Sequence, residues 1–302
     1  MNPTDSEDSF ARFYGNTLSP QAAVLAEFRR RYPEKVIQDS AAEWRYRVIG
    51  TAGPVLLAVP GGELVNDLGF EFALAFSDCR RILYPAYPRV DSMEALASGL
   101  VAILDAEKIE QAAILGASFG GALAQVFVRK YPERISHLIL SNTGVPLRYL
   151  APSVRVFNWI ARALPWSTTA ALLRRSMPKL LDPAGNKRAF WSAYIDEMLS
   201  TRVTKADMLA NFRIQLDYHQ RFHFTPKDLE DWHGKVFIAE SDTDVIGPRR
   251  RTALRQTYPN AEVYTFHNAG HAPMFSRPDE YLAMLKRFLD CDAETNAGRT
   301  AS

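Results

Sequence analysis

A serine between glycines gives the sharpest chemical signal in the chain. Residues 116–121 read Gly-Ala-Ser-Phe-Gly-Gly, which places Ser118 at the centre of a G-x-S-x-G pattern. An apolar run typical of a buried strand, 112–115, precedes the pattern, and a helical run, 122–130, follows it. A serine on so sharp a strand-to-helix turn can project its hydroxyl above the edge of a sheet. We therefore predict that Ser118 is a nucleophile; the alternative is a glycine-rich turn that only packs closely.

A serine hydroxyl needs a base and an orienting carboxylate, which on such a turn follow in the order Ser, Asp, His. Asp242 and His271 each come directly after a strand-like run, where open α/β sheets carry their active sites. We predict that His271 takes the proton of Ser118 and that Asp242 orients the imidazole. Asp242 is preferred because it is the first Asp beyond its strand, while Asp244 and Glu240 remain alternatives.

The developing oxyanion of an acyl transfer needs two fixed hydrogen-bond donors. One is expected to be the backbone N–H of Phe119, the residue after the nucleophile. The other is expected from the loop after the strand 55–59, which reads Pro-Gly-Gly-Glu. We predict Gly62 as this donor, with Glu63 as the second choice; a plain Gly-Gly turn is the structural alternative.

Other candidate residues carry weaker signals. His219 and His223 lie four apart, as metal ligands on a helix do, but the glutamate of an H-E-x-x-H motif is missing. They are interpreted as residues of a helical lid, and neither a metal nor another cofactor is predicted. Four aromatic residues could line a pocket but are more typical of a core: Tyr84, Tyr87, Trp159 and Trp166.

The hydrophobic pattern predicts a mostly parallel sheet flanked by helices, because short apolar runs alternate with longer helical ones. The expected strands are 44–49, as an outer antiparallel strand, and 54–59, 81–84, 112–115, 136–140, 236–238 and 263–266. Pro85 is expected to break the third of these. Asp91 with Glu94 resembles a capping box that opens a helix through residue 105, and a closing amphipathic helix is expected at 281–289.

The chain divides by pattern into four parts. Residues 1–43 are expected to be an N-terminal extension with a helix, and 44–144 together with 231–290 the α/β core. Residues 145–230 lose the strand signal and predict an inserted helical cap, and 291–302 a disordered tail. The polar ends, 1–10 and 292–302, are both expected to be disordered.

The composition is that of an ordinary globular protein and argues against some partners. The 302 residues include 36 Lys and Arg against 34 Asp and Glu, so the formal charge is +2. Such a small charge does not predict a nucleic-acid groove or an anionic membrane surface, and two Arg triplets, 29–31 and 249–251, are interpreted as solvated helix faces. No apolar stretch reaches the roughly 18 residues of a membrane span.

Cysteine usage and the N-terminus predict the compartment. Cys79 and Cys291 show no ligand-like spacing and are expected to be free thiols, as in a reducing environment. The acidic start, with Asp5, Glu7 and Asp8, does not fit a secretory signal. A cytoplasmic location is therefore predicted.

Together these motifs resemble the α/β-hydrolase superfamily over about residues 44–290. The resemblance rests on the Gly-x-Ser-x-Gly turn, the loop at 60–62, Tyr-Pro-Glu-Arg-Ile at 131–135, Ala-Glu-Ser-Asp at 239–242 and Gly-His-Ala-Pro at 270–273. Pro60 departs from the pattern, since the family usually has His there. Residues 115–125 and 258–261 are also similar to the maspardin branch. Epoxide hydrolases and dehalogenases fit less well, because they have Asp where this chain has Ser118.

The resemblance implies an α/β-hydrolase fold with an inserted helical cap that covers the pocket and selects the substrate. It implies a cofactor-independent serine hydrolase that acts on a small or medium, mainly uncharged ester, lactone or amide. The partner is then a small-molecule substrate. Two alternatives remain: a non-catalytic, maspardin-like binding protein, and another reaction on the same residues, such as carbon–carbon hydrolysis or perhydrolysis.

Overall fold

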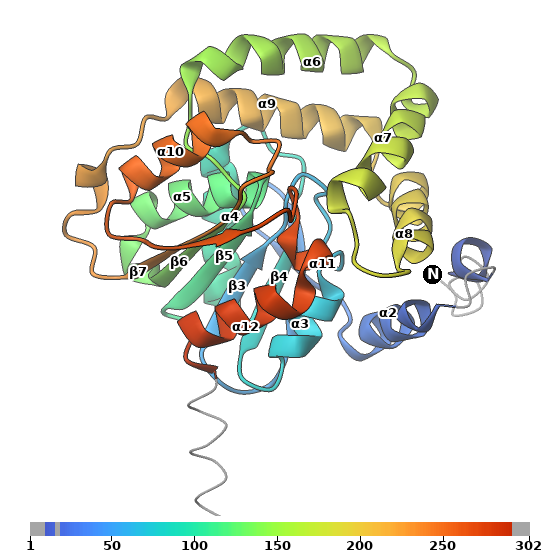
Figure 1. Cartoon of the computed structure of the whole chain (residues 1–302), viewed down its shortest axis with the longest axis horizontal. Helices are drawn as coiled ribbons and strands as arrows, with labels where there is room; N and C mark the ends of the chain where they lie inside the picture. The colour runs from blue at the N-terminus through green and yellow to red at the C-terminus, as the bar shows by residue number, and fades with distance from the viewer. Residues whose placement is uncertain (1–9, 16–18, 292–302) are drawn as a thin grey trace, which may run out of the picture.

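The computed structural model describes residues 10–15 and 19–291 of the chain. The disorder predicted for the two ends concerns residues that lie outside this part, apart from Phe10 and Cys291, which are both helical, so the prediction is wrong for these two. The described residues form an eight-stranded mixed sheet with helices on both faces (Figure 1). The predicted fold class is thus confirmed.

The strands follow the order β1-β2-β4-β3-β5-β6-β7-β8 across the sheet. The pairs β1–β2 and β2–β4 are antiparallel, and all the other neighbours are parallel. The strand bounds are β1 Lys35–Gln38, β2 Glu43–Ile49, β3 Val55–Val59, β4 Arg81–Ala86, β5 Ala112–Ala117, β6 Ile135–Ser141, β7 Lys235–Ser241 and β8 Glu262–Phe266.

Helices connect these strands and form the segment between β6 and β7. The helices outside that segment are α2 Pro20–Arg31, α3 Phe70–Phe76, α4 Met93–Ala106, α5 Phe119–Lys130, α10 Pro248–Thr257, α11 Pro273–Ser276 and α12 Pro278–Phe288. Those between β6 and β7 are α6 Ala151–Ala163, α7 Trp166–Leu181, α8 Arg188–Thr201 and α9 Lys205–Arg221. Short 3₁₀ turns occupy η1 Pro132–Arg134, η2 Arg148–Leu150 and η3 Pro226–Leu229.

The sheet separates two hydrophobic cores, because successive side chains of a strand point to opposite faces. In β3, Leu56 packs into the core under α2, α3, α8 and α12, whereas Leu57 packs into the core under α4, α5 and α10. Both side chains are fully buried. Burial on both faces explains why the parallel strands read as continuous apolar runs rather than alternating ones.

Three local predictions were wrong for identifiable reasons. The strand β1 was missed because it is short and mostly exposed. Pro85 does not end β4, because it pairs with Tyr46 of β2. On the other side, β4 pairs with β3 only as far as Leu83. Pro85 therefore lies where no hydrogen bond to β3 is needed, and a missing N–H is tolerated there. The helix α4 is capped by Ser92, whose hydroxyl accepts from the N–H of Ala95, and not by Asp91.

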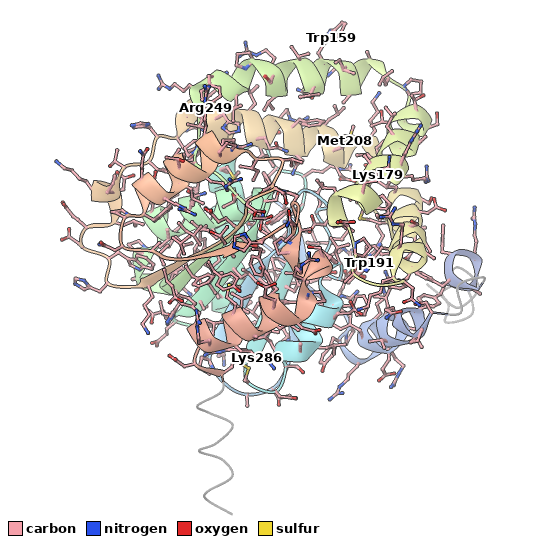
Figure 2. The ribbon with its side chains drawn as sticks, viewed as in Figure 1. Trp159, Lys179, Trp191, Met208, Arg249 and Lys286 are labelled. Carbon is pink, nitrogen blue, oxygen red and sulfur yellow. A yellow bond between two sulfur atoms is a disulfide. The ribbon has the colours of Figure 1, made fainter. Side chains whose placement is uncertain are left out.

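The helical segment α6–α9 lies together over one end of the sheet (Figure 1). Helix α6 packs along α9, and α7 packs against α8. Trp159 of α6 points away from the body of the protein and is 71% exposed (Figure 2). The insertion therefore matches the predicted place of a cap, whereas the interpretation of Trp159 as a core or pocket residue is wrong.

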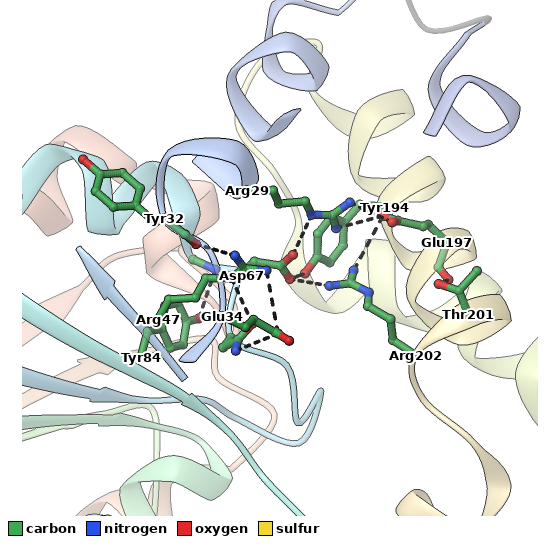
Figure 3. Close-up of polar contacts among 12 residues, drawn as sticks. Arg29, Tyr32, Glu34, Arg47, Asp67, Tyr84, Tyr194, Glu197, Thr201 and Arg202 are labelled. Atoms are coloured by element: carbon green, nitrogen blue, oxygen red, sulfur yellow. Dashed lines mark hydrogen bonds and ion pairs between the residues drawn. The ribbon is translucent and has the colours of Figure 1, made fainter. Parts of the chain in front are cut away.

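A buried ionic cluster ties this segment to the N-terminal helix and to the loop after β3 (Figure 3). The fully buried carboxylate of Asp67 accepts from Arg29 Nε at 2.8 Å and from Arg202 Nη1 at 2.6 Å, and also from the hydroxyl of Tyr194. Arg29 donates onward to Glu197 of α8 at 2.7 Å. Residues from three distant parts of the chain are thus joined through one carboxylate.

The two cysteines, Cys79 and Cys291, form a disulfide, which corrects the prediction of free thiols. Their Cα atoms lie 5.6 Å apart although 212 residues separate them in sequence. Only the folded chain brings the end of α12 beside the turn that precedes β4, so the spacing in sequence held no sign of the bond. Within residues 10–15 and 19–291, no helix has the length and hydrophobicity that a membrane crossing requires.

Candidate active site

Ser118 lies on the sharp turn between β5 and α5. Its backbone has φ 52° and ψ −116°, a strained conformation for a residue with a side chain. The turn explains the flanking glycines: a Cβ on Gly116 would lie 2.3 Å from the carbonyl oxygen of Gly120, and a Cβ on Gly120 would lie 2.5 Å from that of Pro60. The structure thus brings Gly116 and Gly120, two residues before and two after the serine, close together, as the motif requires.

The imidazole of His271 lies between Ser118 and a carboxylate. Its Nε2 is 3.0 Å from Ser118 Oγ, and its Nδ1 is 2.7 Å from Oδ1 of Asp244. The side chain of Asp244 is 1% exposed and that of His271 11%. Asp244 is held in place by further donors, the side-chain amide of Asn142 at 2.8 Å and the N–H of Ile246 at 3.0 Å. The imidazole is therefore oriented from below by a fixed, buried acceptor.

Asp242, the residue preferred from the sequence, makes no hydrogen bond or ion pair with His271, whereas the alternative Asp244 makes both. The carboxylate of Asp242 accepts from His267 Nδ1 at 2.9 Å and from the N–H of Asn268 at 2.8 Å, and its side chain is 37% exposed. These hydrogen bonds, first that of His267, lower the pKa of Asp242. Asp242 thus holds the loop that carries the histidine, whereas Asp244 contacts the imidazole itself.

The shift of two residues arises because β7 is longer than its apolar run. Apolar side chains end at Ala239, but the strand continues through Ser241, and the N–H of Asp242 still donates to Phe266 of β8. The chain leaves the sheet only in the following turn. Glu240, the other alternative, is engaged by Arg255 of α10, which donates to it through Nε at 3.0 Å.

The two predicted oxyanion donors lie beside Ser118. Phe119 is the first residue of α5, where an N–H has no acceptor within the helix. Gly62 faces the same cavity as Ser118, and a Cβ on it would meet nothing within 4 Å. In the described part of the chain, the N–H of Gly62 donates to no group, whereas that of Gly61 is bound at 2.8 Å by Glu63. Gly62 is thus free to meet a ligand.

An apolar cavity of about 300 Å³ opens from Ser118 and His271. It lies between the sheet and the inserted helices, which contribute four side chains of α7 to its wall. Its other apolar side chains come from β3, β4, β5, α3 and the segment after His271. The lining from α7 is Leu173, Met177, Leu180 and Leu181, and the facing residues include Leu68, Phe72, Tyr84, Met274, Phe275 and Tyr281.

Glu63 is the acidic residue of this cavity. Burial raises its pKa, against the lowering effect of hydrogen bonds from backbone N–H groups, including that of Gly61, and of the nearby His271. No Lys or Arg lines the cavity among the residues that the structure describes. The cavity is therefore suited to an uncharged, apolar chain and disfavours an anion.

Several supporting residues escaped the sequence analysis. Asn142 and Thr143 follow β6, and Thr143 donates its hydroxyl to the carbonyl of Ser118 at 2.7 Å. The signal was present, since a Ser-Asn-Thr-Gly run directly follows an apolar strand. His219, interpreted as a lid residue, is buried on α9, whereas His223 is exposed, and the two rings share no site.

A comparison with models of protein families identifies the family of the chain. The model described as "alpha/beta hydrolase fold" matches residues 84–278, which is more than half of the chain. The chain belongs to the α/β-hydrolase fold family. The resemblance drawn from the motifs is thereby confirmed at the level of the superfamily, while the maspardin branch receives no support.

Several curated proteins are similar to the chain at low identity. An uncharacterized protein of Mycobacterium tuberculosis is 25% identical over 225 residues, which cover 67% of this chain and 63% of that protein. The sn-1-specific diacylglycerol lipase of Mus musculus is 21% identical over 209 residues, 66% of this chain and 65% of its own. The esterase YbfF of Escherichia coli is 25% identical over 233 residues, 76% of this chain and 87% of its own.

Solved structures of other hydrolases share this α/β-hydrolase fold. A hydrolase from Pseudomonas aeruginosa superposes with a TM-score of 0.72 at 19% identity, over 85% of this chain and 98% of its own. A thermophilic esterase from Thermogutta terrifontis gives a TM-score of 0.67 at 20% identity, with the same coverage. At these identities the likeness concerns the fold.

Proposed function

We propose that the protein is a cofactor-independent serine hydrolase that cleaves a small or medium ester, lactone or amide through an acyl-enzyme. The observation that carries this proposal is the hydrogen-bonded series from Asp244 through His271 to Ser118, at the mouth of an apolar cavity. A serine, an imidazole and a buried carboxylate in this order can activate the hydroxyl as a nucleophile.

In the first half of the proposed reaction, Ser118 Oγ attacks the carbonyl carbon of the substrate. His271 Nε2 takes the hydroxyl proton, and Asp244 stabilises the resulting imidazolium through Nδ1. The negative charge that develops on the carbonyl oxygen is met by the N–H groups of Phe119 and Gly62. His271 then returns the proton to the departing alcohol or amine, and the acyl group stays on Ser118.

Water completes the cycle by the same route. His271 takes a proton from the water as its oxygen attacks the acyl carbon, and the proton is then returned to Ser118 Oγ as the carboxylic acid leaves. Phe119 and Gly62 again meet the oxyanion. The cycle consumes the substrate and one water, and it returns Ser118, His271 and Asp244 to their starting state.

Both the cavity and the relatives support an apolar acyl chain. Burying each methylene in such a cavity contributes about 0.8 kcal/mol, so a chain of several carbons is bound strongly enough to be selected. The family membership and the presence of an esterase and a lipase among the similar proteins support acyl transfer rather than binding alone.

The proposal is tested by labelling with a fluorophosphonate, which reacts with activated serines, and by mapping the modified peptide. We expect the label on Ser118 and not on Ser141 or Ser241. Ser118→Ala should lose the label and at least about 10⁴-fold in kcat on a short p-nitrophenyl ester, with an unchanged melting temperature. Labelling that persists in this variant would remove the nucleophile, and a protein that neither labels nor turns over would favour a binding role.

A further inference from the structure

A second cavity, of about 270 Å³, also opens at the proposed nucleophile. It shares Gly62, Ser118 and His271 with the apolar cavity, so the two chambers meet at the point where a scissile carbonyl must lie. Its remaining walls come from α4, α5, α9, α10 and the segments after β6 and β7. The side chains that give it a polar character are Thr143, Gln215, His219 and Arg250.

Arg250, on α10, contributes a cation to this second chamber. Its Nε is buried and has no hydrogen-bond partner, and no ion pair joins its guanidinium to any residue within 10–15 and 19–291. Its neighbours in the Arg triplet differ: Arg249 is exposed, and Arg251 donates to the carbonyl of Asp242 at 3.3 Å. Arg250 is therefore the member of the triplet that turns inward without an acceptor.

Arg250 is half-buried, with its Nε enclosed and without a hydrogen-bond partner. Because a charge that loses water without gaining a partner is destabilised, this position favours an anion beside the guanidinium. Burial is the largest effect on the pKa of Arg250 and lowers it, while the charges of Tyr218, Tyr149 and Asp244 act in the opposite direction. Asp244 interacts with Arg250 through its charge, but no hydrogen bond or ion pair joins the two side chains. The oxygens of Asp244 accept instead from His271, Asn142 and the N–H of Ile246. A bound ligand could therefore supply the hydrogen-bond acceptor that Arg250 Nε lacks among the described residues.

His219 adds a neutral donor to the same chamber. Its Nδ1 accepts from the N–H of Leu147 at 3.1 Å, which leaves the ring proton on Nε2. Burial, with a smaller effect of the nearby Arg250, lowers the pKa of His219 to about 4, so the ring is neutral at physiological pH. Neither Asp nor Glu is among the described residues that line this chamber.

The two chambers thus differ in charge. Among the described residues, the first is lined by the carboxyl of Glu63 and by no Lys or Arg, whereas the second is lined by the guanidinium of Arg250 and by no Asp or Glu. A substrate with an apolar end and an anionic end fits in one orientation only, with its carbonyl at Ser118. Reversed, its anion would face Glu63 and its apolar chain would bury Arg250.

We propose that the second chamber binds a carboxylate or phosphate carried by the substrate, while the apolar chain lies in the first chamber. The inference rests on the proposed serine-hydrolase function. It narrows the proposed substrate to an amphiphilic, anionic one, in place of the mainly uncharged substrate that the sequence predicted. Arg250 acts as a binding residue for this anion, at the end of the molecule remote from the apolar chain.

The test compares neutral esters with matched anionic ones. Phenyl butanoate is paired with m-butanoyloxybenzoate and with m-butanoyloxyphenyl phosphate, which place a carboxylate or a phosphate on the leaving group. The p-nitrophenyl ester of pentanoate is paired with the p-nitrophenyl hemiester of glutarate, which places the carboxylate on the acyl side. We expect at least one anionic ester to exceed its neutral partner in kcat/KM by ~10-fold or more, a typical gain for a charge-assisted bond. The ester that shows this gain identifies the bound anion as a carboxylate or a phosphate. It also shows whether the second chamber binds the acyl part or the leaving group of the substrate.

Variants of the triplet assign the preference to one side chain. Arg250→Met should lower the anionic-to-neutral ratio of kcat/KM by ~10-fold or more, and Arg250→Lys, which keeps the charge, should retain part of it. Arg249→Met, on the same helix but exposed, should leave the ratio and the activity unchanged. Melting temperatures and fluorophosphonate labelling verify that each variant is folded.

Three outcomes overturn the inference while leaving the hydrolase in place. The first is turnover of neutral esters with no anionic preference in any pair. The second is an equal loss on neutral and anionic esters in Arg250→Met, which would mean that the guanidinium acts on Asp244 and His271 instead. The third is the same change of ratio in Arg249→Met, which would mean long-range attraction. Absence of both labelling and turnover in the unaltered protein would instead overturn the proposed function.

Discussion

The Nδ1 atom of His271 lies 2.7 Å from Oδ1 of Asp244, although Asp242 is the first Asp after the apolar run of its strand. The two carboxylates differ in burial, because that of Asp244 is almost fully enclosed, whereas that of Asp242 is partly exposed to solvent beside His267. An enclosed carboxylate orients and stabilises an imidazolium far better than a solvated one, because water screens the charge less.

The first prediction compares Asp244→Asn with Asp242→Asn on a p-nitrophenyl ester. The first change should lower kcat about 10³- to 10⁴-fold, because His271 loses the acceptor that holds its tautomer. The second should lower kcat less than about tenfold, since Asp242 holds only the loop through His267 and Asn268. Both variants should bind fluorophosphonate more slowly in the same ranking, and the reverse ranking would return the acidic role to Asp242.

The second prediction concerns the acyl chain. Met177→Trp should fill part of the apolar cavity, so the ratio of kcat/KM for hexanoyl over acetyl esters should fall at least about tenfold. Trp159→Ala serves as the control, because Trp159 belongs to the same inserted segment but points away from the cavity (Figure 2). An unchanged chain-length profile in Met177→Trp would mean that the acyl chain lies elsewhere.

The third prediction uses the buried carboxylate of Asp67. Burial alone would raise its pKa, but Arg202 and Arg29 outweigh this effect and hold the pKa of Asp67 well below its usual range. A depressed carboxyl pKa in the folded protein adds stability above the unfolded value of about 3.9, and this stability is lost as the pH falls below it. Asp67→Asn should therefore cost about 3–5 kcal/mol at pH 7.

The measurement is urea unfolding of both proteins from pH 7 down to pH 3. The difference between the unaltered protein and Asp67→Asn should shrink on acidification, since Asp67 takes up a proton at a higher pH in the unfolded protein than in the folded one. Asp78→Asn, an exposed position, is the control and should change little at any pH. A difference that stays constant with pH would show that the contribution of Asp67 is not ionic.

The fourth prediction concerns the bond between Cys79 and Cys291. Because it closes a long loop, the disulfide should contribute about 2–5 kcal/mol, and dithiothreitol should lower the melting temperature by on the order of 5–15 °C. The double variant Cys79→Ser and Cys291→Ser should melt at the lower temperature with and without reductant. Equal melting of the oxidised and reduced protein would contradict a structural role for the bond.

Local patterns determined the fold class and two members of the candidate site. The turn around Ser118 needs glycines at the positions that its own backbone crowds, so strand, turn and helix are written in consecutive residues. His271 likewise follows an apolar strand directly. The turn at Ser118 and the position of His271 can be predicted from sequence because the residues that cause them lie within a few positions of one another.

Only the tertiary structure decided which carboxylate meets the imidazole, because Asp242 and Asp244 differ by how far β7 pairs with β8 before the chain turns. The same holds for the disulfide, which joins residues 212 apart, and for the inward turn of Arg250 within a triplet of identical residues. Whether a side chain is buried, and which distant residue it contacts, depends on how several segments of the chain pack together. A short stretch of sequence therefore cannot predict them, because the contacting residues come together only in the folded protein.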